Sequence, residues 1–136
     1  MTRYAMLVDL GKCIGCETCK HVCNEMHVRP FAGKRREILK PVQPSSSDHR
    51  SIFFPIHCMH CEKPTCLNVC PTGATKKLSD GTVIVNDTVC MGCGACVLAC
   101  PYEARELTSH RPAESANQQE EPAKIGTCIK CDFCQN

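Results

Sequence analysis

The chain of 136 residues has no tryptophan, only two tyrosines and only four phenylalanines. It also lacks any run of 18 or more apolar residues, so the sequence offers no candidate transmembrane helix. The apolar run near Met1 ends at Asp9, which is too short for the hydrophobic region of a secretory signal. A sequence this poor in large apolar residues cannot build the core of an ordinary α/β enzyme, and it needs covalent or metal cross-links instead.

What the sequence has in abundance is cysteine, with 15 residues. Disulfides, zinc sites and iron–sulfur clusters are the three uses to consider. An odd number of cysteines and no visible secretion signal argue against a disulfide framework. Zinc sites are commonly built from Cys-x-x-Cys pairs, often with histidine, whereas iron–sulfur clusters use tight runs of thiolates and a further one from elsewhere.

The spacing of the cysteines favours [4Fe–4S] clusters over zinc and disulfides. One run, Cys90-x2-Cys93-x2-Cys96-x3-Cys100 followed by Pro101, has the full pattern of bacterial ferredoxins. The other runs are Cys13-x2-Cys16-x2-Cys19-x3-Cys23, Cys58-x2-Cys61-x4-Cys66-x3-Cys70 and Cys128-x2-Cys131-x2-Cys134. Glycines inside these loops, such as Gly92 and Gly94, allow the backbone to wrap closely around a cluster.

The ferredoxin rule for ligands predicts how the two middle runs cooperate. In two-cluster ferredoxins, the fourth cysteine of each run binds the other cluster. One cluster is therefore expected on Cys58, Cys61, Cys66 and Cys100, and its neighbour on Cys90, Cys93, Cys96 and Cys70. This crossing would fasten the two halves of one module together, so folding should depend on cluster insertion.

The order of predicted elements indicates an α+β fold made of small ferredoxin-like modules. We expect strands at 4–9 and 52–56, short helices at 17–27 and 94–99, and a hairpin of 74–78 with 82–86 around Asp80-Gly81. Residues 52–108 form the central two-cluster module, and residues 1–30 with 125–136 form the halves of a second, incomplete module. Residues 31–51 are interpreted as a basic insertion, and residues 109–124 as a polar linker.

Two minor features have a plain and a functional interpretation each. The basic stretch 29–40 is either a solvated hairpin or a docking surface for an acidic partner or lipid headgroups. His57 and His60 are either ordinary loop residues or hydrogen-bond donors that tune a cluster.

The charge of the chain gives no support for nucleic acid as a partner. The formal charge of +2 becomes about −6 if four oxidised clusters bind, because each contributes about −2 with its thiolates. The sequence also has no basic stripe with interleaved aromatic residues.

Several motifs closely resemble one family, the iron–sulfur subunits of the dimethyl sulfoxide reductase family of molybdopterin oxidoreductases. They are Cys58-Met-His-Cys61, Cys66-Leu-Asn-Val-Cys70-Pro71, Cys96-Val-Leu-Ala-Cys100-Pro101-Tyr102 and Cys131-Asp-Phe-Cys134. The resemblance implies four [4Fe–4S] clusters in two ferredoxin-like modules. It further implies that Cys13, Cys16 and Cys19 hold a third cluster, and that Cys23, Cys131 and Cys134 serve a fourth.

The resemblance is incomplete after Cys134. The family has two more cysteines in its last run, so we expect this sequence to be truncated at its C-terminus, with two secure clusters here and up to four in the full-length chain. Cys128 matches no family ligand and is only a candidate one. In a rival assignment, Cys128, Cys131, Cys134 and Cys23 hold one cluster, while Cys13, Cys16 and Cys19 lack a fourth thiolate.

The resemblance implies a non-catalytic subunit that carries electrons between a membrane quinol-linked subunit and a molybdopterin catalytic subunit. The sequence shows no nucleotide-binding loop and no catalytic triad signature. The alternatives are a free soluble polyferredoxin and a zinc-stapled interaction module. The expected location is a membrane-associated complex, either cytoplasmic or exported to the periplasm with a partner that carries the signal.

Overall fold

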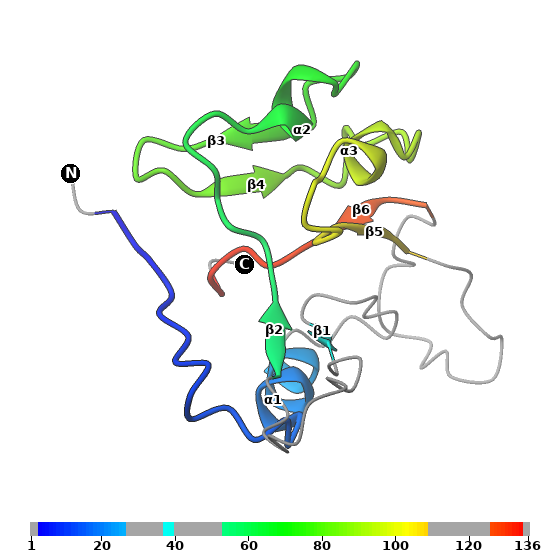
Figure 1. The fold of residues 1–136 in the computed structure, drawn as a ribbon. Helices are drawn as coiled ribbons and strands as arrows, with labels where there is room; N and C mark the ends of the chain where they lie inside the picture. The colour runs from blue at the N-terminus through cyan, green and yellow to red at the C-terminus, as the bar shows by residue number, and fades with distance from the viewer. Residues whose placement is uncertain (1–2, 27–36, 40–52, 109–125, 135–136) are drawn as a thin grey trace, which may run out of the picture.

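The computed structural model describes residues 3–26, 37–39, 53–108 and 126–134. The predicted linker 109–124 and most of the predicted insertion 31–51 lie outside these ranges. Within them, the chain forms short helices and strands joined by long loops (Figure 1).

The central part of the chain repeats one unit of strand, cysteine loop, helix and strand. The first copy runs from β2 (Phe54–Ile56) through α2 (Thr65–Asn68) to β3 (Thr75–Lys77). The second runs from β4 (Val83–Val85) through α3 (Ala95–Leu98) to β5 (Glu106–Leu107). The predicted strand at 52–56 and helix at 94–99 are therefore confirmed to within one or two residues.

The hairpin predicted around Asp80-Gly81 is present. Strands β3 and β4 pair antiparallel, with Thr75 opposite Val85 and Lys77 opposite Val83. Gly81 has a positive φ of 88°, and the Asp80 carboxylate accepts a hydrogen bond from the Thr82 N–H at 2.8 Å. The turn chemistry thus sets the register, which points Val83 into the core with an exposure of 1%.

The two copies of the unit contact each other through their helices. Helix α2 contacts α3 and β3. The Thr65 hydroxyl at the start of α2 donates to the Ala99 carbonyl at the end of α3, at 2.9 Å. The cysteine loops that precede α2 and α3 are thereby brought to the same part of the molecule.

A late segment completes this central part. Strand β6 (Cys128–Ile129) pairs antiparallel with β5, with Leu107 opposite Cys128. The Thr108 N–H donates to the Thr127 carbonyl at 2.8 Å, which extends the ladder by one step. Figure 1 shows β6 beneath α3 and β4 rather than beside α1.

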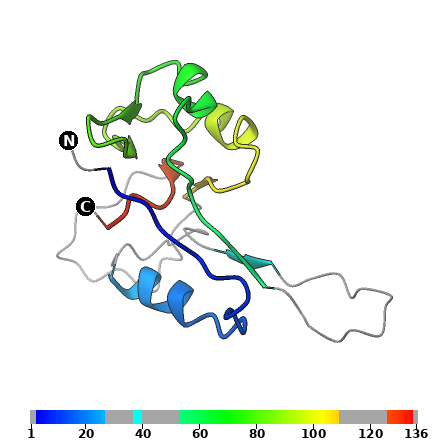
Figure 2. The ribbon, with the colours of Figure 1, turned by 60° about the vertical axis from the view of Figure 1, so that its left-hand side comes forward.

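Helix α1 (Thr18–Met26) lies at the other end of the molecule in both views, whereas the chain before it runs back to the central part, where Arg3 pairs with Glu62 (Figures 1 and 2). Helix α1 agrees with the helix predicted at 17–27, although His27 lies outside the described ranges. Strand β1 (Glu37–Leu39) pairs antiparallel with β2. The strand predicted at 4–9 is wrong, because these residues are in no strand and the Leu7 side chain is 95% exposed.

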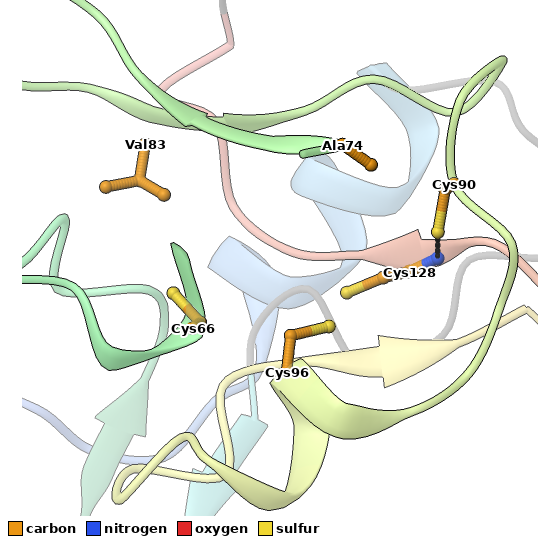
Figure 3. Close-up of a cluster of buried hydrophobic side chains, with 6 residues drawn as sticks. All are labelled: Cys66, Ala74, Val83, Cys90, Cys96 and Cys128. Carbon is orange, nitrogen blue, oxygen red and sulfur yellow. Dashed lines mark hydrogen bonds between the residues drawn. The ribbon is translucent and has the colours of Figure 1, made fainter. Parts of the chain in front are cut away.

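The core of the central part is built largely from thiols. Its buried cluster of side chains consists of Cys66, Ala74, Val83, Cys90, Cys96 and Cys128, so cysteines outnumber the aliphatic residues two to one (Figure 3). The scarcity of large apolar residues in the sequence is therefore matched by a core that has almost none.

Candidate iron–sulfur sites

The loop between Cys90 and α3 surrounds a cavity, called here the Cys90 pocket. Its lining includes Cys90, Cys93 and Cys96 from this loop and Cys70 from the end of the preceding unit. The surface of the cavity is mostly apolar apart from the thiols. These four residues are the set that the crossed ligand rule predicts for one cluster.

Two glycines shape this pocket. Gly92 has a φ of +73°, and a Cβ atom on it would lie 2.2 Å from the Gly126 carbonyl oxygen. Gly94 has a φ of +75° and is the residue that caps the start of α3. Both positions need glycine, the first for a close approach of two backbones and the second for a left-handed turn.

The second predicted set of thiols also lies together. Burial raises the pKa of the Cys66 thiol, and negative charge on Cys58, Cys100 and Cys61 raises it further. The hydrogen bond from the Thr65 hydroxyl to the Ala99 carbonyl holds the next residues along each segment, Cys66 and Cys100, in neighbouring parts of the chain. Cys58 and Cys66 are buried, whereas Cys61 and Cys100 are partly exposed.

Backbone N–H groups point at two of the thiols in the Cys90 pocket. The Thr75 N–H donates to Cys70 Sγ at 3.4 Å, and the Cys128 N–H donates to Cys90 Sγ at 3.5 Å, as the dashed line in Figure 3 shows. Burial acts to raise the pKa of Cys70, but the hydrogen bonds from Thr75 and Thr72 lower it below its ordinary value overall. The local structure therefore favours thiolate, which is the form that binds metal.

Cys128 differs from the thiols around it. Its sulfur lies beside that of Cys96 in Figure 3, and a hydrogen bond from the Cys128 thiol lowers the pKa of Cys96. The same hydrogen bond, together with burial, raises the pKa of Cys128. Cys96 is therefore the thiolate of this pair and Cys128 the protonated donor.

His60 has a structural explanation. Its Nδ1 accepts a hydrogen bond from the Val83 N–H at 2.9 Å, and its ring stacks on Phe133 at 3.9 Å between centroids. Burial is the largest cause that lowers its pKa, to about 4, so the ring is neutral. His60 thus attaches the Cys58–Cys61 loop to β4 through Nδ1, and a tuning role for its buried Nε2 stays a prediction.

The cysteines at the two ends of the described chain lie on the loop before α1, on α1 itself and after β6. Cys13 and Cys16 lie on the loop before α1, and Cys19 and Cys23 lie on α1 four residues apart, hence on one face. Hydrogen bonds from Thr18 lower the pKa of the exposed Cys16. Cys131 is buried after β6 and Cys134 is exposed. Their predicted grouping into a third and a fourth cluster stays a prediction.

Sequence reasoning missed two buried cations in this region. Arg105, just before β5, and Lys130, just after β6, are each 4% exposed. The Lys130 ammonium donates to the Val83 carbonyl and, at 2.7 Å, to the Cys131 carbonyl. Nothing in their sequence context distinguishes them from surface residues, because their burial results from the β5–β6 pairing.

The Cys90 pocket offers the kind of ligands that a cluster uses, since the four cysteine thiols of the second predicted set line it. In a cubane each of the four thiolates binds a different iron, so the sulfurs stand farther apart than the ligands of a single ion. The apolar Cys90 pocket, with thiolates on several sides and inward N–H groups, fits such a group.

Comparison with known proteins agrees with this geometry. Residues 49–136 match a family described as 4Fe-4S dicluster domain, and residues 12–75 match another with the same description. The chain therefore belongs to the 4Fe-4S dicluster family of ferredoxin-like proteins, and its resident cofactors are [4Fe–4S] clusters.

Its relatives are iron–sulfur subunits of reductases. The chain is 36% identical to a tetrathionate reductase subunit of Salmonella typhimurium, over 97% of this chain and 48% of the relative. It is 33% identical to a selenate reductase subunit of Mesobacillus selenatarsenatis, over 98% and 52%. It is 34% identical to the thiosulfate reductase electron transfer subunit PhsB of Salmonella typhi, over 97% and 62%.

These alignments agree with the family assignment, and one of the relatives is named as an electron transfer subunit. The chain spans about half the length of the curated relatives it matches. None of the helices in the described ranges is long and apolar enough to cross a bilayer.

Proposed function

We propose that this chain relays single electrons between a membrane quinol-linked subunit and a molybdopterin-containing catalytic subunit of a membrane-associated reductase complex. The observation that carries the proposal is that Cys66, from one predicted ligand set, and Cys90 and Cys96, from the other, lie in one buried cluster. The relatives support the assignment to a complex, because they are named as subunits of reductases and one of them as an electron transfer subunit.

The ligand sets that we propose follow the crossed rule. Cys58, Cys61, Cys66 and Cys100 would hold one cluster, and Cys90, Cys93, Cys96 and Cys70 the other. The lining of the Cys90 pocket supports the second set, and the contact of α2 with α3, with its hydrogen bond from Thr65 to Ala99, supports the first. By family resemblance, Cys13, Cys16, Cys19, Cys23, Cys131 and Cys134 would serve two further clusters.

The chemistry of the relay comes from the clusters, which change by one electron each when bound. The chain's own residues orient the thiolates, exclude water from the Cys90 pocket and donate hydrogen bonds to sulfur. No side chain is needed as an acid, base or nucleophile.

Purification from host membranes under anaerobic conditions tests the proposed place in a complex. We expect the chain to co-purify with a molybdenum-containing subunit in a fixed ratio of molybdenum to iron, and a quinol analogue should bleach the clusters of the complex. A chain that stays monomeric in every preparation, and whose clusters take electrons only from soluble donors, would instead be a free polyferredoxin.

A further inference from the structure

Arg105 is a buried cation for which the structure offers no carboxylate partner within the described ranges. Its side chain lies just before β5 and is 4% exposed. Among the residues that the structure describes, Nη1 donates to the Thr75 hydroxyl at 3.2 Å and to Cys128 Sγ at 3.6 Å. In the same part of the chain, Nη2 is buried and has no hydrogen-bond partner. Burying an ion without compensation costs several kcal/mol, so an arrangement like this needs a compensating negative charge.

The groups that Arg105 contacts connect it to both thiol sets. Thr75 and Cys128 line the Cys90 pocket together with the second proposed ligand set. Cys128 also packs in one buried cluster with Cys66 of the first set and with Cys90 and Cys96 of the second. Arg105 therefore lies next to the core that the two cluster sites share.

This position has a direct consequence for redox chemistry. An oxidised cluster with its four thiolates carries a charge of about −2, and reduction adds one more negative charge. A fixed positive charge in a poorly solvated core stabilises the reduced form more than the oxidised form. An N–H donor directed at cluster sulfur acts in the same direction.

We propose that Arg105 is a tuning residue that raises the reduction potentials of both central clusters, through its charge and through the hydrogen bond that Nη2 has to offer. The inference rests on the two crossed ligand sets proposed above. It assigns a redox role to a side chain that binds no iron.

The test compares Arg105→Gln, which removes the charge, with Arg105→Lys, which keeps it. The control is Lys76→Met, which removes an exposed positive charge from β3, one residue from Thr75. Each anaerobically purified variant is analysed for iron and sulfide, and its clusters are titrated by EPR against potential. Signals of the two central clusters are first assigned with Cys66→Ser and Cys96→Ser.

We expect Arg105→Gln to keep its iron and sulfide and to lower both central potentials. A tenfold loss in the equilibrium constant for reduction corresponds to 59 mV for a one-electron couple, and we expect at least this shift in each. The reduction potentials of Arg105→Lys should lie between those of Arg105→Gln and those of the unaltered chain. Lys76→Met should change neither central potential measurably, because water and salt screen an exposed charge.

Three outcomes would overturn the inference. One is full cluster content in Arg105→Gln with unchanged reduction potentials. Another is a shift in the reduction potential of only one of the two central clusters. The third is equal loss of iron from Arg105→Gln and Arg105→Lys, since that would make Arg105 a packing residue. The proposed function would fail differently, by absence of iron and sulfide, or of reducible clusters, from the unaltered chain.

Discussion

At the scale of single residues, neighbouring thiols in one pocket have different roles. Cys90 and Cys96 lie beside Cys128 in the core, and all three are buried. The hydrogen bond between Cys128 and Cys96, together with burial, raises the pKa of Cys128 and favours its protonated form. This favours the assignment in which Cys128 is not a ligand, and the two assignments can be distinguished by measurement.

We expect Cys128→Ala to keep the iron and sulfide content of the unaltered chain, since the replaced thiol is not a ligand. The potential of the cluster in the Cys90 pocket should fall, because Cys96 loses a hydrogen bond that favours extra negative charge. Iron analysis and an EPR-monitored titration check both points. Cys96→Ser is the matched comparison and should lose that cluster. Equal loss of iron in the two variants would make Cys128 a ligand.

Cys70 allows a second test at this scale, which concerns the crossing. Its thiol lines the Cys90 pocket although it follows the loop that begins at Cys58. Cys70→Ser should therefore abolish or convert the cluster held by Cys90, Cys93 and Cys96 and leave the neighbouring cluster intact. EPR of the reduced variant distinguishes the two signals. Loss confined to the Cys58–Cys66 cluster would show that each run fills its own site.

At the scale of elements, the loop at Gly92 has no room for a larger side chain, because its backbone lies against the segment before β6. Alanine at position 92 combines a left-handed backbone with a Cβ 2.2 Å from the Gly126 carbonyl oxygen. We expect Gly92→Ala to destabilise the protein by roughly 2–5 kcal/mol, the sum of the backbone and overpacking costs. The temperature at which visible absorbance disappears is a suitable measurement.

Gly73→Ala is the control for this prediction. Gly73 has a similar φ of +66°, but a Cβ there would meet nothing within 4 Å. This variant should cost only about 1–2 kcal/mol, the cost of the backbone conformation alone. Equal effects of the two substitutions would mean that the contact with Gly126 is unimportant.

The elements also show which parts of the fold the sequence can predict. The β3–β4 hairpin was predictable because Asp80-Gly81 is a local signal that specifies both the turn and the register. Residues 4–9 alternate in hydrophobicity without forming a strand, since a strand also needs a partner with free N–H and C=O groups. The pairing of β5 with β6 joins residues about 20 positions apart, and no local pattern encodes it.

The same distinction applies to the candidate sites. Cysteine spacing predicted two ligand sets, and the four cysteines of one of them line the Cys90 pocket. The protonated Cys128 and the buried Arg105 and Lys130 could not be predicted, because their environment is created by long-range pairing. Spacing reports which thiols face one site, whereas the charges around that site depend on tertiary contacts.

At the scale of the whole molecule, the cofactors replace the hydrophobic core. Four of the six side chains in the central buried cluster are cysteines, and the two others are Ala74 and Val83. Burial of so few methyl groups cannot offset the conformational entropy of ordering the chain. We therefore expect the native state to be stable only with its clusters bound.

Anaerobic removal of iron with an oxidant and a chelator tests this expectation. Far-UV circular dichroism and protease sensitivity should both report extensive unfolding as the visible absorbance is lost, and reconstitution with iron and sulfide should reverse it. A metal-free chain that keeps its protease resistance would show that the polypeptide folds without its cofactors.

The position of β6 has a consequence for how the protein is made. A nascent chain that has left the ribosome as far as Leu107 already presents all eight thiols of the two central sites. It still lacks the Cys128 N–H that reaches Cys90, and β5 is an unpaired edge. We therefore expect the eight thiols to be more accessible to iron and sulfide before β6 is synthesised than after it pairs with β5.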